Sequence, residues 1–122
     1  MEQLPGRYTQ GEPNSLAAGV PPLLDQRHLL RQTLGDAALK AVVLGLFLDE
    51  APGYAANIVT APDAKAWRMS VHTLKGVALN LGAFRLAQLC RQHEAMGFGL
   101  VDTAELTALI AATAGVIRRE LA

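Results

Sequence analysis

The sequence predicts an all-α protein, an antiparallel four-helix bundle with an additional short N-terminal helix. After Pro21 and Pro22 the chain is rich in Ala, Leu and Val. No stretch alternates apolar and polar residues for long enough to suggest a strand. Residues that favour helix starts and stops divide the chain into four main segments with short connections, which is typical of antiparallel neighbours.

The composition fits one soluble domain of 122 residues. Eleven Lys and Arg balance eleven Asp and Glu, so we expect no nucleic-acid partner. The single cysteine, Cys90, cannot form an internal disulfide. Charged residues such as Asp49, Lys65 and Lys75 interrupt the apolar runs, so we expect no membrane span. These features predict a cytoplasmic monomer.

Residues 1–21 are rich in Pro, Gly and polar side chains and lack the basic start and apolar segment of a signal peptide. We expect a disordered leader over 1–21 and one folded domain over 22–122.

Capping residues predict the first two helices. A short helix should run from Asp25 to Leu34 and stop at Gly35. Asp36 should cap a second helix, which Pro52 should kink or end near Glu50. The apolar face of this second helix should carry Leu39, Val42, Val43, Leu46 and Phe47.

Three further helices are predicted after residue 61. Pro62 and Asp63 should begin one that ends at Gly82. The next should span about 83–96, with Leu86, Leu89, Cys90 and His93 on one stripe, before Gly-Phe-Gly at 97–99. Asp102 and Glu105 have capping-box spacing ahead of the last helix.

His72 lies in the middle of the predicted helix over 62–82. With about 100° of rotation per residue, the side opposite His72 forms a core stripe of Trp67, Ser70, Leu74, Val77, Ala78 and Leu81. Six residues lie on the same face as His72, namely Lys65, Arg68, Met69, Lys75, Gly76 and Leu79. His72 should therefore be accessible to solvent.

Lys75 and Gly76 follow His72 at the two spacings that place side chains beside one another on a helix. An imidazole has an ordinary pKa near 6.5, so at pH 7 a ring nitrogen can attack phosphorus. If His72 is phosphorylated, Lys75 could neutralise the oxygens of the phosphoryl group, and Gly76 would leave room for them. Glycine inside a helix costs about 1 kcal/mol relative to Ala, so a glycine in mid-helix beside an exposed histidine calls for an explanation.

The segment HTLKGVALNLGA, residues 72–83, resembles the signature of the histidine-containing phosphotransfer (HPt) domain family. The resemblance continues in LLDQRHLLRQTLG, FLDEAPG and RLAQLCRQHE and covers about residues 23–121. It implies a phosphorelay carrier of two-component signalling that accepts a phosphoryl group on His72 from a receiver aspartate and passes it to another. Lys75 would stabilise the phosphoryl group and Gly76 would give it access.

The resemblance also implies the partners, which are response-regulator receiver domains, including that of a hybrid histidine kinase. Mg²⁺ would belong to the receiver, and this chain would need no cofactor or metal of its own. It shows no ATP-binding loop, so we expect a carrier without autokinase activity rather than an enzyme.

Two positions depart from the family pattern. Glu94 stands where some members have Gln, and its carboxylate could orient the ring of His72. Leu79 stands where a small residue is usual. We expect Arg68, Met69 and Leu79 to form a partner-binding surface around His72.

Other interpretations remain open at this point. The chain could be the dimerisation and phosphoacceptor segment of a histidine kinase, although Thr73 replaces the acidic residue that usually follows the histidine. It could also be an adaptor bundle without phosphoryl chemistry. Glu94 could simply pair with Arg91, and we expect His93 to be a packed, hydrogen-bonded core residue.

Overall fold

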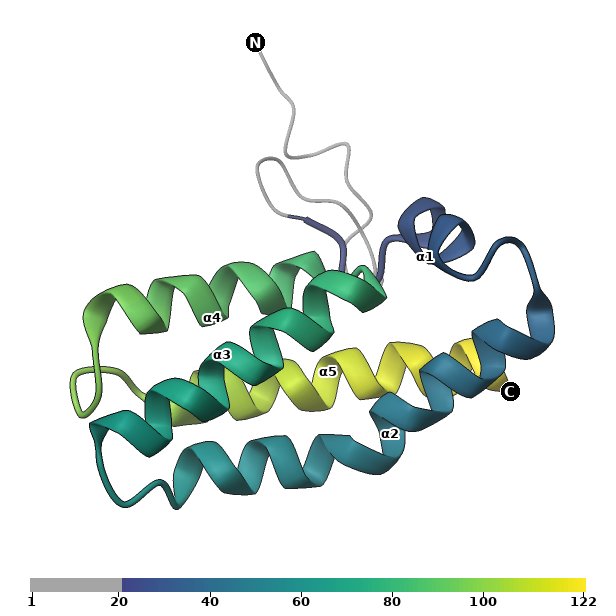
Figure 1. Cartoon of the computed structure of the whole chain (residues 1–122). Coiled ribbons are helices and arrows are strands. Elements are labelled where there is room, and N and C mark those ends of the chain that lie inside the picture. The colour runs from purple at the N-terminus through teal and green to yellow at the C-terminus, as the bar shows by residue number, and fades with distance from the viewer. Residues whose placement is uncertain (1–20) are drawn as a thin grey trace, which may run out of the picture.

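The computed structural model describes residues 21–122, which form five helices and no strand. The helices are α1 (Gln26–Gln32), α2 (Ala37–Val59), α3 (Ala64–Leu81), α4 (Phe84–Met96) and α5 (Thr103–Leu121), as Figure 1 shows. The all-α class is therefore confirmed. The expected leader lies outside the described residues, apart from position 21.

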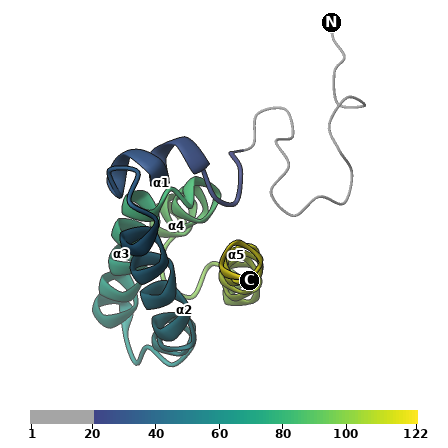
Figure 2. The ribbon, with the colours of Figure 1, turned by 90° about the vertical axis from the view of Figure 1, so that its right-hand side faces the viewer.

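Helices α2 to α5 run side by side, and α1 lies across one end of them. Helix α3 packs against α4 and α2, and α5 packs against α2 and α4. Helix α1 contacts α3, and the view along the helices shows α1 near the ends of α3 and α4 (Figure 2). Helix α3 therefore has neighbours on two sides, which leaves its outer face free.

The N-caps predicted at Asp25, Asp36 and Asp102 are confirmed, and Asp63, which was expected only to lie at the start of α3, is an N-cap as well. Because the first backbone N–H groups of a helix lack partners within it, a capping carboxylate that accepts from them stabilises the start by about 1 kcal/mol. One expectation is wrong, because Glu105 completes no capping box and its side chain contacts His93 instead. The four capping side chains are those of Asp25, Asp36, Asp63 and Asp102.

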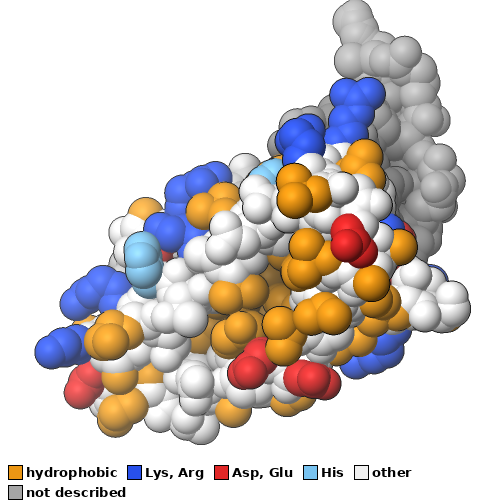
Figure 3. Space-filling view, turned by 45° about the vertical axis from the view of Figure 1, so that its right-hand side comes forward, with side chains coloured by type: hydrophobic (Ala, Val, Ile, Leu, Met, Phe, Trp, Pro, Cys, Tyr) orange, Lys and Arg blue, Asp and Glu red, His pale blue; other side chains and the backbone are white. Residues whose placement is uncertain are grey.

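Helix α2 differs from the prediction in two ways. It does not end near Glu50 but continues through Pro52 to Val59, and Figure 1 shows that it changes direction along its length. Its expected apolar face is largely in solvent, with Leu39, Val42 and Leu46 40%, 58% and 56% exposed. Figure 3 shows hydrophobic side chains gathered on this surface. The residues that α2 buries are Leu44, Phe47, Ala51 and Ile58.

The spacing of apolar residues in the sequence indicated the wrong buried face because α2 is apolar on more than one side. Of the described helices, α2 alone is long and apolar enough to cross a membrane, judged by length and composition. Core helices of soluble proteins pass the same test, so this property is weak support for a membrane span.

The core stripe of α3 is confirmed. Trp67, Leu74, Ala78 and Leu81 are buried, as is Val71 beside them, whereas Ser70 and Val77 are half-buried. Burying a side chain as large as Leu contributes about 1.5–3 kcal/mol, so this stripe strongly fixes the rotation of α3. The opposite face, which carries His72, must then point outward.

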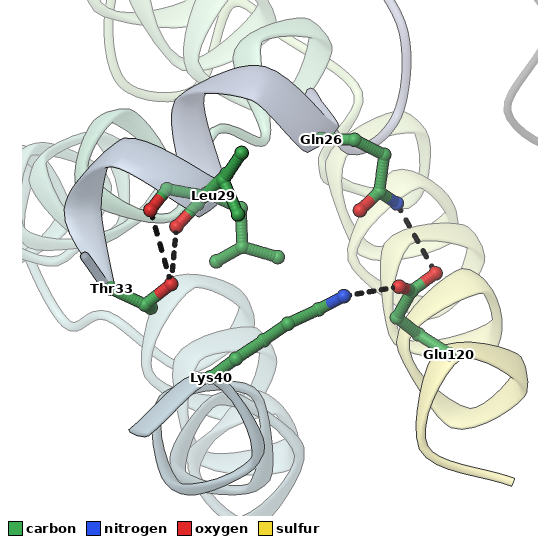
Figure 4. A network of polar contacts seen from close by, with 6 residues as sticks. Gln26, Leu29, Thr33, Lys40 and Glu120 are labelled. Atoms are coloured by element: carbon green, nitrogen blue, oxygen red, sulfur yellow. Dashed lines mark hydrogen bonds and ion pairs between the residues drawn. The ribbon is translucent and has the colours of Figure 1, made fainter. Parts of the chain in front are cut away.

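Polar contacts link α5 to α1 and α2 at one end of the domain (Figure 1). The Glu120 carboxylate on α5 accepts from the Gln26 amide on α1 and from the Lys40 ammonium on α2, at 3.2 and 2.7 Å (Figure 4). The Thr33 hydroxyl at the end of α1 donates to the Leu29 carbonyl over 2.8 Å. The Glu120 contacts link α5 to α1 and to α2, whereas the Thr33 contact is local to the end of α1.

Gly82 joins α1 to the end of α3. Its φ of +91° is rare for residues with a side chain, and its carbonyl accepts from the Asp25 N–H over 2.9 Å. A Cβ at this position would lie 3.1 Å from the Asp25 carbonyl oxygen and 3.2 Å from the His28 ring. The same His28 ring contacts the Asn80 carbonyl and forms a T-shaped pair with the ring of Phe84.

Replacing Gly82 by Ala should destabilise the fold more than replacing Gly99. Both glycines have positive φ, but a Cβ at Gly99 meets nothing within 4 Å. We expect Gly99→Ala to lower the free energy of unfolding by about 1 kcal/mol from backbone strain alone, and Gly82→Ala by about 2 kcal/mol or more. Urea unfolding would measure both, and equal losses would show that the contact with α1 contributes nothing.

Candidate functional site

His72 stands on the outer face of α3, opposite the buried stripe. Its side chain is 72% exposed, whereas Val71 and Leu74 beside it are fully buried. The sequence-based prediction that His72 is accessible in the middle of a helix is confirmed. The backbone of α3 sets the position of the His72 side chain, and solvent or a partner can reach the outer edge of its imidazole ring.

Glu94 approaches His72 from the neighbouring helix. Its Oε2 lies 3.5 Å from Nδ1 of His72, and its Oε1 accepts a 2.7 Å hydrogen bond from Nζ of Lys75. The Glu94 carboxylate thus bridges the histidine and the lysine, which lie one turn apart on α3. The alternative pairing of Glu94 with Arg91 is not what the structure shows.

The Lys75–Glu94 ion pair is shielded from water. The two side chains are only 21% and 18% exposed. Charge-assisted hydrogen bonds of this length are strong. Because the pair is partly buried, water and salt screen its attraction less than that of an ion pair on the surface. In this structure the ammonium of Lys75 is therefore bound to α4 and neutralised there.

The contact between His72 and Glu94 favours one arrangement of the imidazole. A carboxylate beside Nδ1 favours the proton on that nitrogen, which leaves the lone pair on Nε2. The 3.5 Å distance exceeds the usual 2.7–3.2 Å of an N–H···O hydrogen bond, so the attraction in this state is mainly electrostatic. The site can thus present Nε2 as a nucleophile toward solvent.

A hollow of about 260 Å³ adjoins His72 on the side toward the start of α3. It is lined by Lys65, Arg68, Met69, His72 and Glu94. The sequence pattern places Lys65 on this face of the helix without assigning it to the site, although its spacing of seven residues from His72 could indicate such a role. The hollow brings two cations to the edge of the histidine.

The rest of the predicted surface also lies around His72. Gly76 is exposed, and a Cβ built on it would meet nothing within 4 Å. Met69 and Leu79 are 62% and 38% exposed, on the same face of α3. The folded chain therefore combines an open position at Gly76 with exposed apolar side chains beside the histidine.

The other two histidines are separate from this site. His93 is 3% exposed, and its Nε2 lies 3.1 Å from Oε1 of Glu105, so the prediction of a hydrogen-bonded core residue is confirmed. His28 contacts α3 and α4 at the end of the domain. Within residues 21–122, no three His, Cys, Asp or Glu side chains gather as they would around a metal ion.

Cys90 lies in the core one turn before Glu94. Burial raises the pKa of its thiol to about 12, and the charge of Glu94 adds to the rise while Lys75 opposes it. A thiol with so high a pKa stays protonated at neutral pH and is a poor nucleophile.

The Cys90 thiol should resist alkylation while the protein is folded. At pH 8 its thiolate fraction is far below that of an ordinary cysteine, so reaction with iodoacetamide should be slower than in denaturant by at least about a hundredfold. Mass spectrometry of timed samples with and without guanidinium would measure both rates. Similar rates in the two conditions would contradict a buried, protonated thiol.

One comparison with known proteins identifies the family, and another supports the fold. The family model described as Hpt domain matches residues 42–120, which is more than half of the chain. A crystal structure of histidine-containing phosphotransfer protein B (HptB) from Pseudomonas aeruginosa PAO1 is similar, with a TM-score of 0.69 and 24% sequence identity. The match covers 81% of this chain and 94% of that one. No curated protein sequence matches.

Proposed function

Because this chain belongs to the Hpt domain family, and is thus a histidine phosphotransfer carrier of two-component phosphorelays, we propose that His72 is its phosphoacceptor. The observation that carries the assignment is the geometry of His72. The residue is 72% exposed on α3, its Nδ1 faces a carboxylate, and the HTLKG segment begins with it. Neither His28 nor His93 combines these features.

The proposed reaction is an in-line transfer from a receiver aspartyl phosphate. Nε2 of His72 attacks phosphorus, and the N–P bond forms as the bond to the aspartyl oxygen breaks. The aspartate leaves as a carboxylate with the electron pair of that bond. The proton stays on Nδ1, where Glu94 stabilises the positive charge of the phosphorylated ring. Attack by a second receiver aspartate reverses these steps.

Lys75 and Gly76 would assist this transfer in different ways, one by its charge and the other by the space that it leaves. Lys75 can reach the phosphoryl oxygens from one turn away if its ammonium moves from Glu94. Gly76 leaves the space beside the phosphoryl group open to the receiver. Arg68, Met69 and Leu79 would contact the receiver, and Leu79 would help to select among receivers.

Hpt proteins interact with response-regulator receiver domains, and they are carriers rather than kinases. We extend this to a receiver of a hybrid histidine kinase as one partner, with the Mg²⁺ bound by the receiver. The chain would neither bind ATP nor phosphorylate itself. We also propose a cytoplasmic monomer whose α2 to α5 form an antiparallel four-helix bundle, with α1 as the additional helix.

Label transfer would test the phosphoacceptor. Incubation with phosphorylated receiver domains, or with phosphoramidate as a small donor, should give the wild type an acid-labile, base-stable phosphoryl label. His72→Gln should lose the label while keeping the circular dichroism spectrum of the wild type, since its side chain is mostly in solvent. A label that persists in His72→Gln, or a wild type that no donor labels, would reject the assignment.

Gly76→Ala should stabilise the protein but slow transfer. A Cβ fits at this helical position, so the free energy of unfolding should rise by about 0.5–1 kcal/mol. The same methyl group should lower the rate of transfer from a receiver severalfold, because it occupies space beside the phosphoryl group. Gly45→Ala in α2, where a Cβ also meets nothing within 4 Å, is the matched control.

Urea unfolding and rapid-quench labelling would measure the two effects of each substitution. Gly45→Ala should raise stability without changing the rate. An unchanged rate in Gly76→Ala would show that glycine is not needed for access.

A further inference from the structure

Some of the cations around His72 form an ion pair and others do not. Lys75, the cation closest to it toward the end of α3, is bound to Glu94 at 2.7 Å. Within residues 21–122, neither Lys65 nor Arg68 forms an ion pair. Among the described residues, the hollow beside His72 is therefore lined by two cations that form no ion pair, Lys65 and Arg68, on the side toward the start of α3.

Arg68 is the better placed of these two cations. It precedes His72 by four residues, a spacing that brings side chains together on one helix face, whereas Lys65 is almost two turns away. Both line the hollow beside His72, with Glu94 at its edge. A guanidinium also offers a fork of N–H donors that matches two phosphoryl oxygens at once, which an ammonium does not.

We propose that Arg68 binds the phosphoryl group on His72, and that Glu94 restrains Lys75 from doing so to the same extent. The inference rests on His72 as the phosphoacceptor. It assigns Arg68 a part in the chemistry in addition to contact with a partner. A phosphoryl group carries close to two negative charges near pH 7, so Lys75 would have to leave Glu94 unpaired beside that charge in order to reach it.

The second ionisation of the phosphoryl group reports which cation lies against it. A cation in contact favours the dianion and lowers the pH midpoint of the ³¹P signal, and its removal raises that midpoint. The full chain, labelled by phosphoramidate in the absence of any receiver, would be titrated by ³¹P NMR. Because no partner is present, an effect of Arg68 on docking cannot contribute.

We expect Arg68→Gln to raise the midpoint by about half a pH unit, the size of one cation at about 5 Å in water. Arg68→Lys should keep most of the wild-type value. Lys65→Gln, a matched loss of charge farther along the same face, should shift the midpoint much less. Lys75→Gln combined with Glu94→Gln, which removes the ion pair without leaving an unpaired carboxylate, should also shift the midpoint of the wild type much less. Measured against Glu94→Gln alone, where Lys75 is released, Lys75→Gln should have a clearly larger effect.

Three results would overturn the proposal: no shift in Arg68→Gln, an equal shift in Lys65→Gln, or a larger shift in Lys75→Gln combined with Glu94→Gln than in Arg68→Gln. Failure of the underlying function looks different. In that case the wild type gives no ³¹P signal that His72→Gln removes, and no titration can be recorded.

Discussion

The burial of one face of α3 is the constraint on which the site depends. Trp67, Leu74 and Ala78 can leave water only if α3 keeps its present rotation between α2 and α4. That rotation sends His72 outward, and it brings Lys75 against the helix that carries Glu94. The imidazole of His72 therefore needs no loop to position it. Its place follows from packing on the far side of the same helix.

Glu94 then decides how the charges around His72 are shared. One carboxylate oxygen holds Lys75 and the other faces the ring, so a single side chain from α4 acts on two residues of α3. A glutamine at this position could accept from the ring but could not form the ion pair. The departure from the family pattern thus changes the electrostatics of the site more than its shape, because the charge of Lys75 is paired while Arg68 forms no ion pair among the described residues.

The sequence predicted the elements that local chemistry determines. Asp63 and Gly82 bound α3 because a carboxylate cap and a left-handed glycine are short-range signals, and the two faces of α3 followed from a helical period of 3.6. For α2 the same method failed, since Leu39 and Leu46 have the spacing of a core face yet lie in solvent. The same method also could not predict contacts between side chains far apart in the sequence. Spacing could not show that Glu105 turns to His93, or that Glu94 holds Lys75.

The thiol of Cys90 is sensitive to the charges beside His72. It is sealed in the core, but its ionisation responds to Glu94 and Lys75 at the rim of the site, with opposite signs. Any event that separates that ion pair must change the electric field at the sulfur, even if no atom of the core moves. The S–H stretching vibration, which absorbs in a spectral window free of other protein bands, could therefore register the charge state of the surface site without a foreign label.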